Sequence, residues 1–158
     1  MKIITEYLYH IKDDFFDKLK NYELMINREN GHSRPSYLEI KDNDILWFIP
    51  LSTKVSKYKP MIENEIKKYG SCKTIMIKRI ADRNQVILIQ NVFPTLEKYV
   101  KNLHTVEGKP IQIATSVCDE ILNNFKYTLS LKEDGLNLFF NDIDKIMDVI
   151  NNEIKMGV

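Results

Sequence analysis

Apolar and polar residues alternate through the middle of the chain, which is the spacing of strands that bury one face. Residues 36–41 and 45–51 form two such segments, and the polar stretch KDND that joins them predicts an antiparallel hairpin. Residues 74–80 and 85–93 predict a second pair of strands around the turn ADRN, with Pro94 ending the later strand.

Other segments repeat their apolar residues every three or four positions, as helices with one buried face do. The predicted helices cover residues 14–22, 59–69, 114–130 and 141–154. Asp13 or Asp14 is expected to cap the first helix, and Asn141 the last. Pro60 fits the first turn of the second helix, and Gly70 fits its C-terminal end.

The remaining segments complete the predicted fold. A short strand is predicted over 6–12, and residues 27–33 predict a turn-rich loop, whereas 98–112 follow neither spacing. The predicted order is a strand and a helix, then four strands with a helix inserted, then two helices. This order indicates the α+β class. Short strands in one small chain favour a compact, highly curved antiparallel sheet or small barrel with surrounding helices. The length predicts a single domain over residues 1–158.

Composition narrows the class of protein without identifying a function. Apolar residues make up 44% of the chain and charged residues 28%, which is typical of globular proteins in water. Neither a membrane-spanning segment nor a signal peptide is recognisable, so a cytoplasmic protein without a membrane partner is expected. Cys72 and Cys118 lack metal or redox spacing and there are only three histidines, so no metal and no cofactor are expected.

The net charge of +1 conceals an uneven distribution along the chain. Residues 54–79 hold eight Lys or Arg and two Glu, a net charge of +6. Residues 119–153 hold three Lys and eight acidic residues, a net charge of −5. This asymmetry predicts one surface that meets a polyanion and another that meets water, although ordinary solvated helix faces account for each segment equally well.

The end of the strand over 45–51 combines side chains that bind phosphate. Ser52 and Thr53 supply hydroxyl donors, and Lys54 and Lys57 supply positive charge. One of the hydroxyls is equally well explained as the cap of a following helix. The residues alone therefore leave both interpretations open.

Arg34 strengthens the phosphate interpretation. It stands at the start of the strand that pairs with 45–51, and in a short hairpin the start of one strand lies beside the end of the other. Arg34 is therefore expected to neighbour Ser52 and Thr53, forming a site for a polyanion. His32, two residues upstream, could also reach this site, although isolated loop histidines are usually inert.

These segments resemble a known group of toxins. RPSYLEI followed by ILWFIPLST is similar to the first half of the Kid/MazF-like toxin fold. A closer resemblance is to the toxins of type III toxin–antitoxin systems, the ToxN/AbiQ/CptN group, and within it to CptN. It rests on YLYHIKDDFFDKL, on Pro50-Leu51-Ser52-Thr53 followed by Lys54 and Lys57, and on VILIQNVFP at 86–94. It covers roughly residues 6–100.

The resemblance implies a metal-independent endoribonuclease. The 2′-OH of RNA would attack the adjacent phosphate, leaving a 2′,3′-cyclic phosphate and a 5′-OH. Ser52 and Thr53 would hold the scissile phosphate, and Arg34 with Lys54 or Lys57 would stabilise its developing charge. His32, Tyr58 or one of the lysines would transfer protons.

The resemblance also implies RNA partners. A small repeat-derived antitoxin RNA would bind and inhibit the toxin, be processed by it, and form a closed protein–RNA hetero-oligomer with it, while cellular or phage mRNAs would be substrates. The basic stretch would guide RNA past the site. The candidate RNA-contacting residues are Tyr58, Lys59, Lys67, Lys68, Lys73, Lys78 and Arg79. The alternative is a small-barrel module that binds RNA or DNA without cleaving it.

Overall fold

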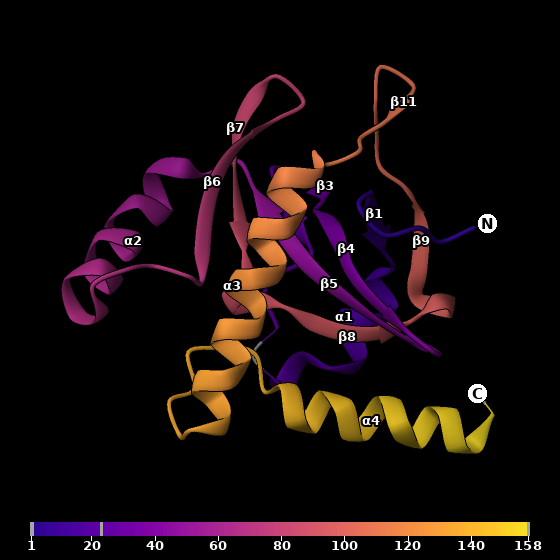
Figure 1. Cartoon of the computed structure of the whole chain (residues 1–158). Coiled ribbons are helices and arrows are strands. Elements are labelled where there is room, and N and C mark those ends of the chain that lie inside the picture. Colours follow the sequence, from indigo (N-terminus) through magenta and orange to yellow (C-terminus); the bar gives the residue numbers. More distant parts are fainter. Residues whose placement is uncertain (1, 23, 158) are drawn as a thin grey trace.

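The computed structural model describes residues 2–22 and 24–157, and its main feature is a seven-stranded sheet with antiparallel pairing throughout (Figure 1). The strands are β1 (Leu8–Ile11), β4 (Pro35–Asp42), β5 (Ile45–Ser52), β6 (Ile75–Ile80), β7 (Arg83–Leu88), β8 (Phe93–Leu96) and β9 (Val100–Leu103). Their order is β6-β7-β5-β4-β1-β9, and β8 pairs with β5. The α+β prediction is confirmed. The barrel is not, because the described strands form an open sheet that ends at β6 and β9.

Strand β5 organises the sheet because it pairs along both of its edges. One edge pairs with β4, and the other is shared between β8, opposite residues 45–48, and β7, opposite Leu51 and Ser52. The single strand predicted over 85–93 is therefore wrong. It is two strands separated by the short helix η2 (Ile89–Asn91), and Pro94 lies inside β8, opposite Trp47. Proline is tolerated there because, among the described strands, β8 pairs only with β5.

Two short hairpins lie outside the main sheet. Strands β2 (Arg28–Glu29) and β3 (His32–Ser33) replace the loop predicted over 27–33, and their turn places Asn30 at φ 53° and Gly31 at φ 80°. Asn-Gly favours this left-handed turn, so the sequence carried the signal for a hairpin. The ambiguous segment 98–112 overlaps the end of η3 (Glu97–Tyr99), and then holds β9 and the hairpin of β10 (Thr105–Val106) with β11 (Lys109–Pro110).

The alternation in β4 and β5 gives the sheet two buried faces. Tyr37, Ile49 and Leu51 pack in one apolar cluster, and Leu38 and Phe48 pack in another. Helix α3 (Thr115–Glu133) crosses in front of β5 and contributes Cys118, Ile121 and Phe125 to the first cluster (Figure 1). The second cluster contains Phe15 of α1 (Asp13–Lys18) and residues Ile146 and Ile150 of α4 (Ile143–Met156). The short helix η1 (Lys20–Tyr22) follows α1.

Helix boundaries differ from prediction where side chains find tertiary partners. Helix α2 (Val55–Tyr69) begins before the predicted residue 59, because Val55 and Tyr58 pack against β6 and β7, and Pro60 therefore lies inside it. Gly70 ends α2 with a left-handed backbone, as predicted. Asp142, not Asn141, caps α4.

Asn141 does not cap α4 because its side chain forms hydrogen bonds elsewhere in the fold. Its buried side-chain amide donates hydrogen bonds to the backbone oxygens of Asn91 and Val92, at 2.8 and 2.9 Å. The side chain of Asp142 accepts a hydrogen bond from the backbone N–H of Lys145 at 3.3 Å and so serves as the cap. No helix among the described residues is long and apolar enough to cross a bilayer.

Glu39 on β4 is a buried carboxyl, and within the described part of the chain its Oε2 has no hydrogen-bond partner. Burial raises its pKa to about 7, against the opposing effects of the Tyr37 hydroxyl and the Lys126 charge. Because the folded-state pKa exceeds the ordinary 4.5, Glu39 increasingly destabilises the fold as the pH rises from about 4.5 to 7.

The variant Glu39→Gln should therefore be stabilised at pH 8, by on the order of 1–3 kcal/mol, and little changed at pH 4.5. Urea unfolding at the two pH values measures the difference. Glu63→Gln, at an exposed position on α2, is the matched control. An equal effect of Glu39→Gln at both pH values would contradict the titration argument.

Candidate functional site

A cleft of about 370 Å³ opens where the β2–β3 hairpin lies beside the end of β5. It is lined by His10, Glu29, Asn30, His32, Ser33, Arg34, Pro35, Leu51, Ser52, Thr53, Arg83, Gln85, His104 and Thr105. Four of the six predicted catalytic residues are among these: Arg34, Ser52, Thr53 and His32. The pairing of β4 with β5, and of β5 with β7, brings these segments together.

Arg34 is held rigidly beside the end of β5, as the hairpin argument predicted. Its guanidinium is buried and donates from Nη1 to the Leu51 carbonyl at 3.0 Å, and from Nε to the Ile26 carbonyl at 3.2 Å. Nη1 also forms an ion pair with Glu29 at 2.5 Å, with both side chains about 10% exposed. Fixed backbone acceptors leave the guanidinium little freedom to reorient.

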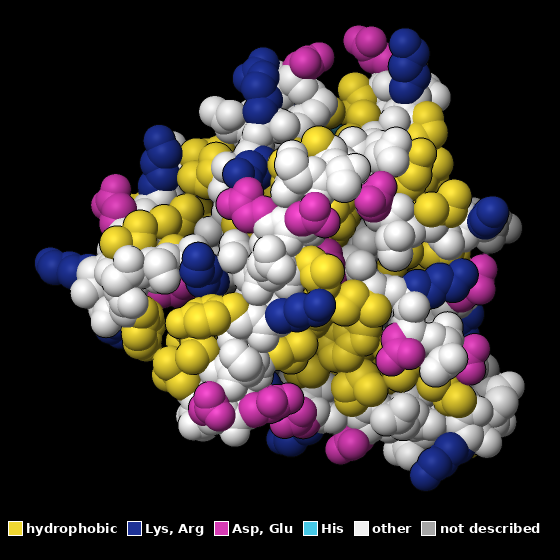
Figure 2. Space-filling model, in the orientation of Figure 1, with side chains coloured by type: hydrophobic (Ala, Val, Ile, Leu, Met, Phe, Trp, Pro, Cys, Tyr) yellow, Lys and Arg dark blue, Asp and Glu magenta, His cyan; other side chains and the backbone are white. Residues whose placement is uncertain are grey.

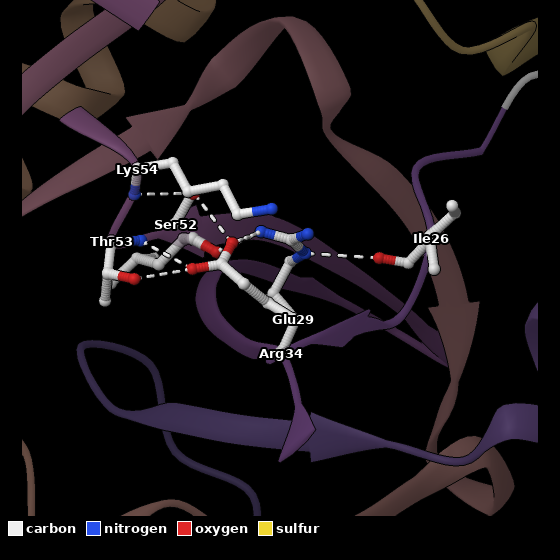
Figure 3. Close-up of polar contacts among 7 residues, drawn as sticks. Ile26, Glu29, Arg34, Ser52, Thr53 and Lys54 are labelled. Atoms are coloured by element: carbon white, nitrogen blue, oxygen red, sulfur yellow. Dashed lines mark hydrogen bonds and ion pairs between the residues drawn. The ribbon is translucent and has the colours of Figure 1, made fainter. Parts of the chain in front are cut away.

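The carboxylate of Glu29 is the centre of the cluster (Figure 3). Its Oε1 accepts hydrogen bonds from the backbone N–H of Thr53 at 2.9 Å and from the Thr53 hydroxyl at 2.6 Å. Its Oε2 accepts from the Ser52 hydroxyl at 2.7 Å and from Arg34. Four donors from two separate segments therefore converge on one anion.

The electrostatics of this arrangement favour negative charge. Burial acts to raise the pKa of Glu29, but the hydrogen bonds from Thr53 and Ser52 and the charge of Arg34 outweigh it and lower the pKa to about 2. The N-terminus of α2 begins two residues after Thr53, and a helix N-terminus also favours anions. The same donors suit the two non-bridging oxygens of a phosphodiester.

The two candidate lysines lie outside the residues that line the cleft. Lys54 donates its backbone N–H to the Ser52 hydroxyl at 3.1 Å, and its side chain is exposed. The ammonium of Lys57 lies 5.3 Å from the centre of the Tyr58 ring. Tyr58 itself is 5% exposed and packs against Ile75 and Val86, so the prediction that it stacks on RNA bases does not fit its burial.

The other predicted RNA-contacting residues are spread along α2 and β6 instead of forming one surface. Lys59, Lys67, Lys68 and Arg79 are exposed, Lys73 is partly buried, and Lys78 forms an ion pair with Glu120 of α3 at 2.7 Å. The helical rise places Lys67 and Lys68 roughly 20 Å from the start of α2. Figure 2 shows basic and acidic side chains interspersed on the face that carries α3, so charges separated in sequence are mixed in space.

Sequence reasoning missed the four other charged or histidine side chains that line the cleft: Glu29, Arg83, His10 and His104. The Asn-Gly hairpin was the available signal for Glu29, since it predicts that residues 28–29 pair with 32–33. No local signal existed for the histidines. They meet because β1 pairs with β9, and these strands are distant in sequence.

The two histidines form a hydrogen-bonded chain with Ser33. Nδ1 of His10 lies 2.5 Å from the Ser33 hydroxyl, and Nε2 of His10 lies 2.8 Å from Nδ1 of His104. Burial, with the charges of His104 and Lys101, lowers the pKa of His10 to about 4, against the opposing effect of Ser33. Burial and Arg83 also lower the pKa of His104. Both rings are therefore neutral near pH 7.

No known protein-family model matches the chain, and no curated protein matches it in sequence. Its fold, however, is that of a solved nuclease toxin. That protein is AbiQ, described as a lactococcal anti-phage endoribonuclease belonging to the type III toxin–antitoxin system. The superposition covers 96% of this chain and 99% of AbiQ, with a TM-score of 0.70 and 18% sequence identity. The fold resemblance to the ToxN/AbiQ group is confirmed, while the closer relation to CptN stays a prediction.

Proposed function

We propose that this chain is the toxin of a type III toxin–antitoxin system and cleaves RNA as an endoribonuclease. The observation that carries the proposal is the convergence of four donors on the Glu29 carboxylate, inside a cleft. The fold shared with AbiQ, which is described as such an enzyme, supports it.

The position that the Glu29 carboxylate occupies, which we call the anion position, suits the scissile phosphate of RNA. A phosphodiester that displaces the Glu29 carboxylate meets Thr53 on one oxygen, and Ser52 with Arg34 on the other. The Leu51 and Ile26 carbonyls already orient Arg34, so these donors need little reorganisation as negative charge develops on phosphate. The exposed ammonium of Lys54 or Lys57 offsets the added charge.

Displacing Glu29 requires only a small element of the fold to move. Glu29 belongs to the β2–β3 hairpin, whose strands are two residues long. Besides the contacts of Glu29 and Arg34, the hairpin is held by the hydrogen bond between Ser33 and His10, at 2.5 Å, and by the exposed ion pair of Arg28 with Asp13, at 2.7 Å. Exposed pairs of this kind contribute about 0–1 kcal/mol. The carboxylate thus keeps the buried donors satisfied until RNA replaces it.

RNA supplies its own nucleophile, so the reaction needs no metal and no covalent enzyme intermediate. The ribose 2′-oxygen forms a bond to phosphorus as the bond to the 5′-oxygen breaks, which leaves a 2′,3′-cyclic phosphate and a 5′-OH. The sequence-derived candidates for proton transfer are His32, Tyr58, Lys54 and Lys57, of which Tyr58 is buried. His32 is exposed at the cleft.

The partners follow from the same proposal. A small repeat-derived antitoxin RNA binds the toxin, occludes the cleft and is itself processed, in a closed protein–RNA hetero-oligomer, while cellular or phage mRNAs are the substrates. Lys54, Lys57 and Lys59 are exposed at the start of α2, next to the anion-binding residues, and suit the RNA backbone. The cytoplasm is the compartment where this activity would operate.

Incubating the purified protein with end-labelled RNA in excess EDTA tests the function. Discrete fragments with 5′-OH and 2′,3′-cyclic phosphate ends are expected, at an unchanged rate with or without EDTA. RNA in which every ribose lacks the 2′-OH is the control and should remain intact. Binding without cleavage would contradict the proposal and favour a nucleic-acid-binding module.

A further inference from the structure

A chain of hydrogen bonds runs from Ser33 through His10 to His104 and ends at Nε2 of His104. Ser33 contacts His10, and His10 contacts Nδ1 of His104, with the two ring centres 4.9 Å apart. None of the described residues hydrogen-bonds Nε2 of His104, and His104 lines the cleft together with Arg34 and Ser52. The chain thus links a hydroxyl on β3 to an available imidazole nitrogen at the cleft.

The tautomers of the two rings are coupled. If Nδ1 of His104 donates to His10, then His10 carries its hydrogen on Nδ1, which donates to Ser33, and Nε2 of His104 is a lone-pair base. If His10 donates instead, Ser33 donates to His10 and Nε2 of His104 becomes an N–H donor. Each arrangement satisfies both internal contacts, so the chain can present a base or an acid without breaking a hydrogen bond.

The chain lies close to the anion-binding residues. His10 pairs across the sheet with Pro35, which follows Arg34, and Ser36 pairs with Pro50. Adjacent strands are about 4.8 Å apart, so roughly 10 Å separates the backbones of β1 and β5. The cleft, lined by Arg34 and Pro35 at the start of the intervening strand β4, therefore has cationic and hydroxyl donors at one end and neutral imidazoles at the other.

We propose that Ser33, His10 and His104 are the proton-transfer chain for RNA cleavage in this cleft, with Nε2 of His104 as the general base. The inference rests on the proposed function. Nε2 takes the 2′-OH proton as the new bond to phosphorus forms and the bond to the 5′-oxygen breaks. The hydrogen on Nδ1 of His104 passes to Nε2 of His10, which spreads the positive charge over the pair. The departing 5′-oxygen gains a proton from solvent, and the pair returns its extra proton to solvent.

The charged groups around His10 and His104 influence the pH range in which His104 can accept a proton. His10 faces His104, Ser33 and Lys101 of β9, and His104 also senses Arg83 of β7. Glu29 and Arg34, an ion pair, line the other end of the cleft. In the free protein burial, and after it these charges, lowers the pKa of both imidazoles, so both rings are neutral near pH 7. A bound phosphodiester offsets those cations, so the imidazoles become stronger bases when RNA is present.

Single-turnover cleavage by His104→Gln and His10→Gln, measured from pH 5 to 8, tests the chain. We expect His104→Gln to lower the rate by roughly 10²–10⁴-fold. RNA affinity should stay within about threefold, because a neutral ring is lost. In the wild type, the acid limb of kcat/KM should lie below 6.5, the ordinary imidazole value, and that of kcat at higher pH, since the latter reports the RNA complex. His10→Gln should shift both limbs.

Asn102→Ala, at an exposed position of β9 that does not line the cleft, is the matched control and should cleave as wild type does. Thermal unfolding establishes that each variant is folded. Suppose that the wild type cleaves RNA. If His104→Gln then cleaves within twofold of the wild-type rate, or if His10→Gln leaves the pH profile unchanged, the proton-transfer proposal is wrong, whereas the proposed endoribonuclease activity is not contradicted. A wild type that cleaves no RNA would overturn both.

Discussion

The double variant Ser52→Ala, Thr53→Val should lose at least 10³-fold in RNA cleavage. Each substitution removes one hydroxyl donor from the anion position, and removal of one such donor commonly costs about 2.7–4 kcal/mol of transition-state stabilisation. The backbone N–H of Thr53 and the guanidinium of Arg34 remain in place. Because the donors act as a unit, the double loss should be smaller than the product of the two single losses.

Single-turnover cleavage at saturating protein measures this effect, since it separates chemistry from binding. Ser56→Ala is the matched control, because it removes a hydroxyl from the exposed first turn of α2, away from Glu29. Urea unfolding should accompany the rates, as the double variant also leaves Glu29 with fewer partners. A folded double variant that retains a tenth of wild-type cleavage would show that the hydroxyls bind Glu29 without serving the reaction.

The local pattern of apolar and polar residues was sufficient to predict the part of the site where Arg34 meets the end of β5. The alternation in 36–41 and 45–51 defines a hairpin, and a hairpin has one register compatible with both buried faces. The neighbourhood of Arg34 with Ser52 follows from that register alone, and the structure shows it. The α+β class followed similarly, from the order of segments whose periods are clear.

The parts that were not predicted were missed for three different reasons. His10 and His104 meet through the pairing of β1 with β9, which only the complete sheet determines. The short helix η2 falls at Gln90-Asn91, a polar pair inside the otherwise apolar run VILIQNVF, and two polar residues alone did not distinguish a break from a continuing strand. Glu29 was missed for a third reason. A carboxylate is not expected in a phosphate site until the structure shows that it satisfies the site's donors.

Arg34→Met should be the most destabilising single substitution in the cleft. It leaves the buried Glu29 carboxylate without its cation, and leaves the carbonyls of Leu51 and Ile26 without the donor they accept from. Removing one partner of a buried pair costs about 3–5 kcal/mol, because the remaining charge is uncompensated. Urea unfolding at pH 7 measures the loss, and RNA cleavage should also disappear.

The pH dependence of that loss separates the ion pair from simple packing. Glu29 has a folded-state pKa of about 2, below its ordinary 4.5, so its stabilising contribution is present above pH 4.5 and is lost as the pH falls towards 2. The difference between wild type and Arg34→Met should therefore shrink across that range. Adding Glu29→Gln to Arg34→Met should restore part of the stability at pH 7, because the uncompensated charge is gone, and should leave cleavage absent. A pH-independent difference, with no recovery in the double variant, would mean that Arg34 stabilises the fold through its backbone contacts alone.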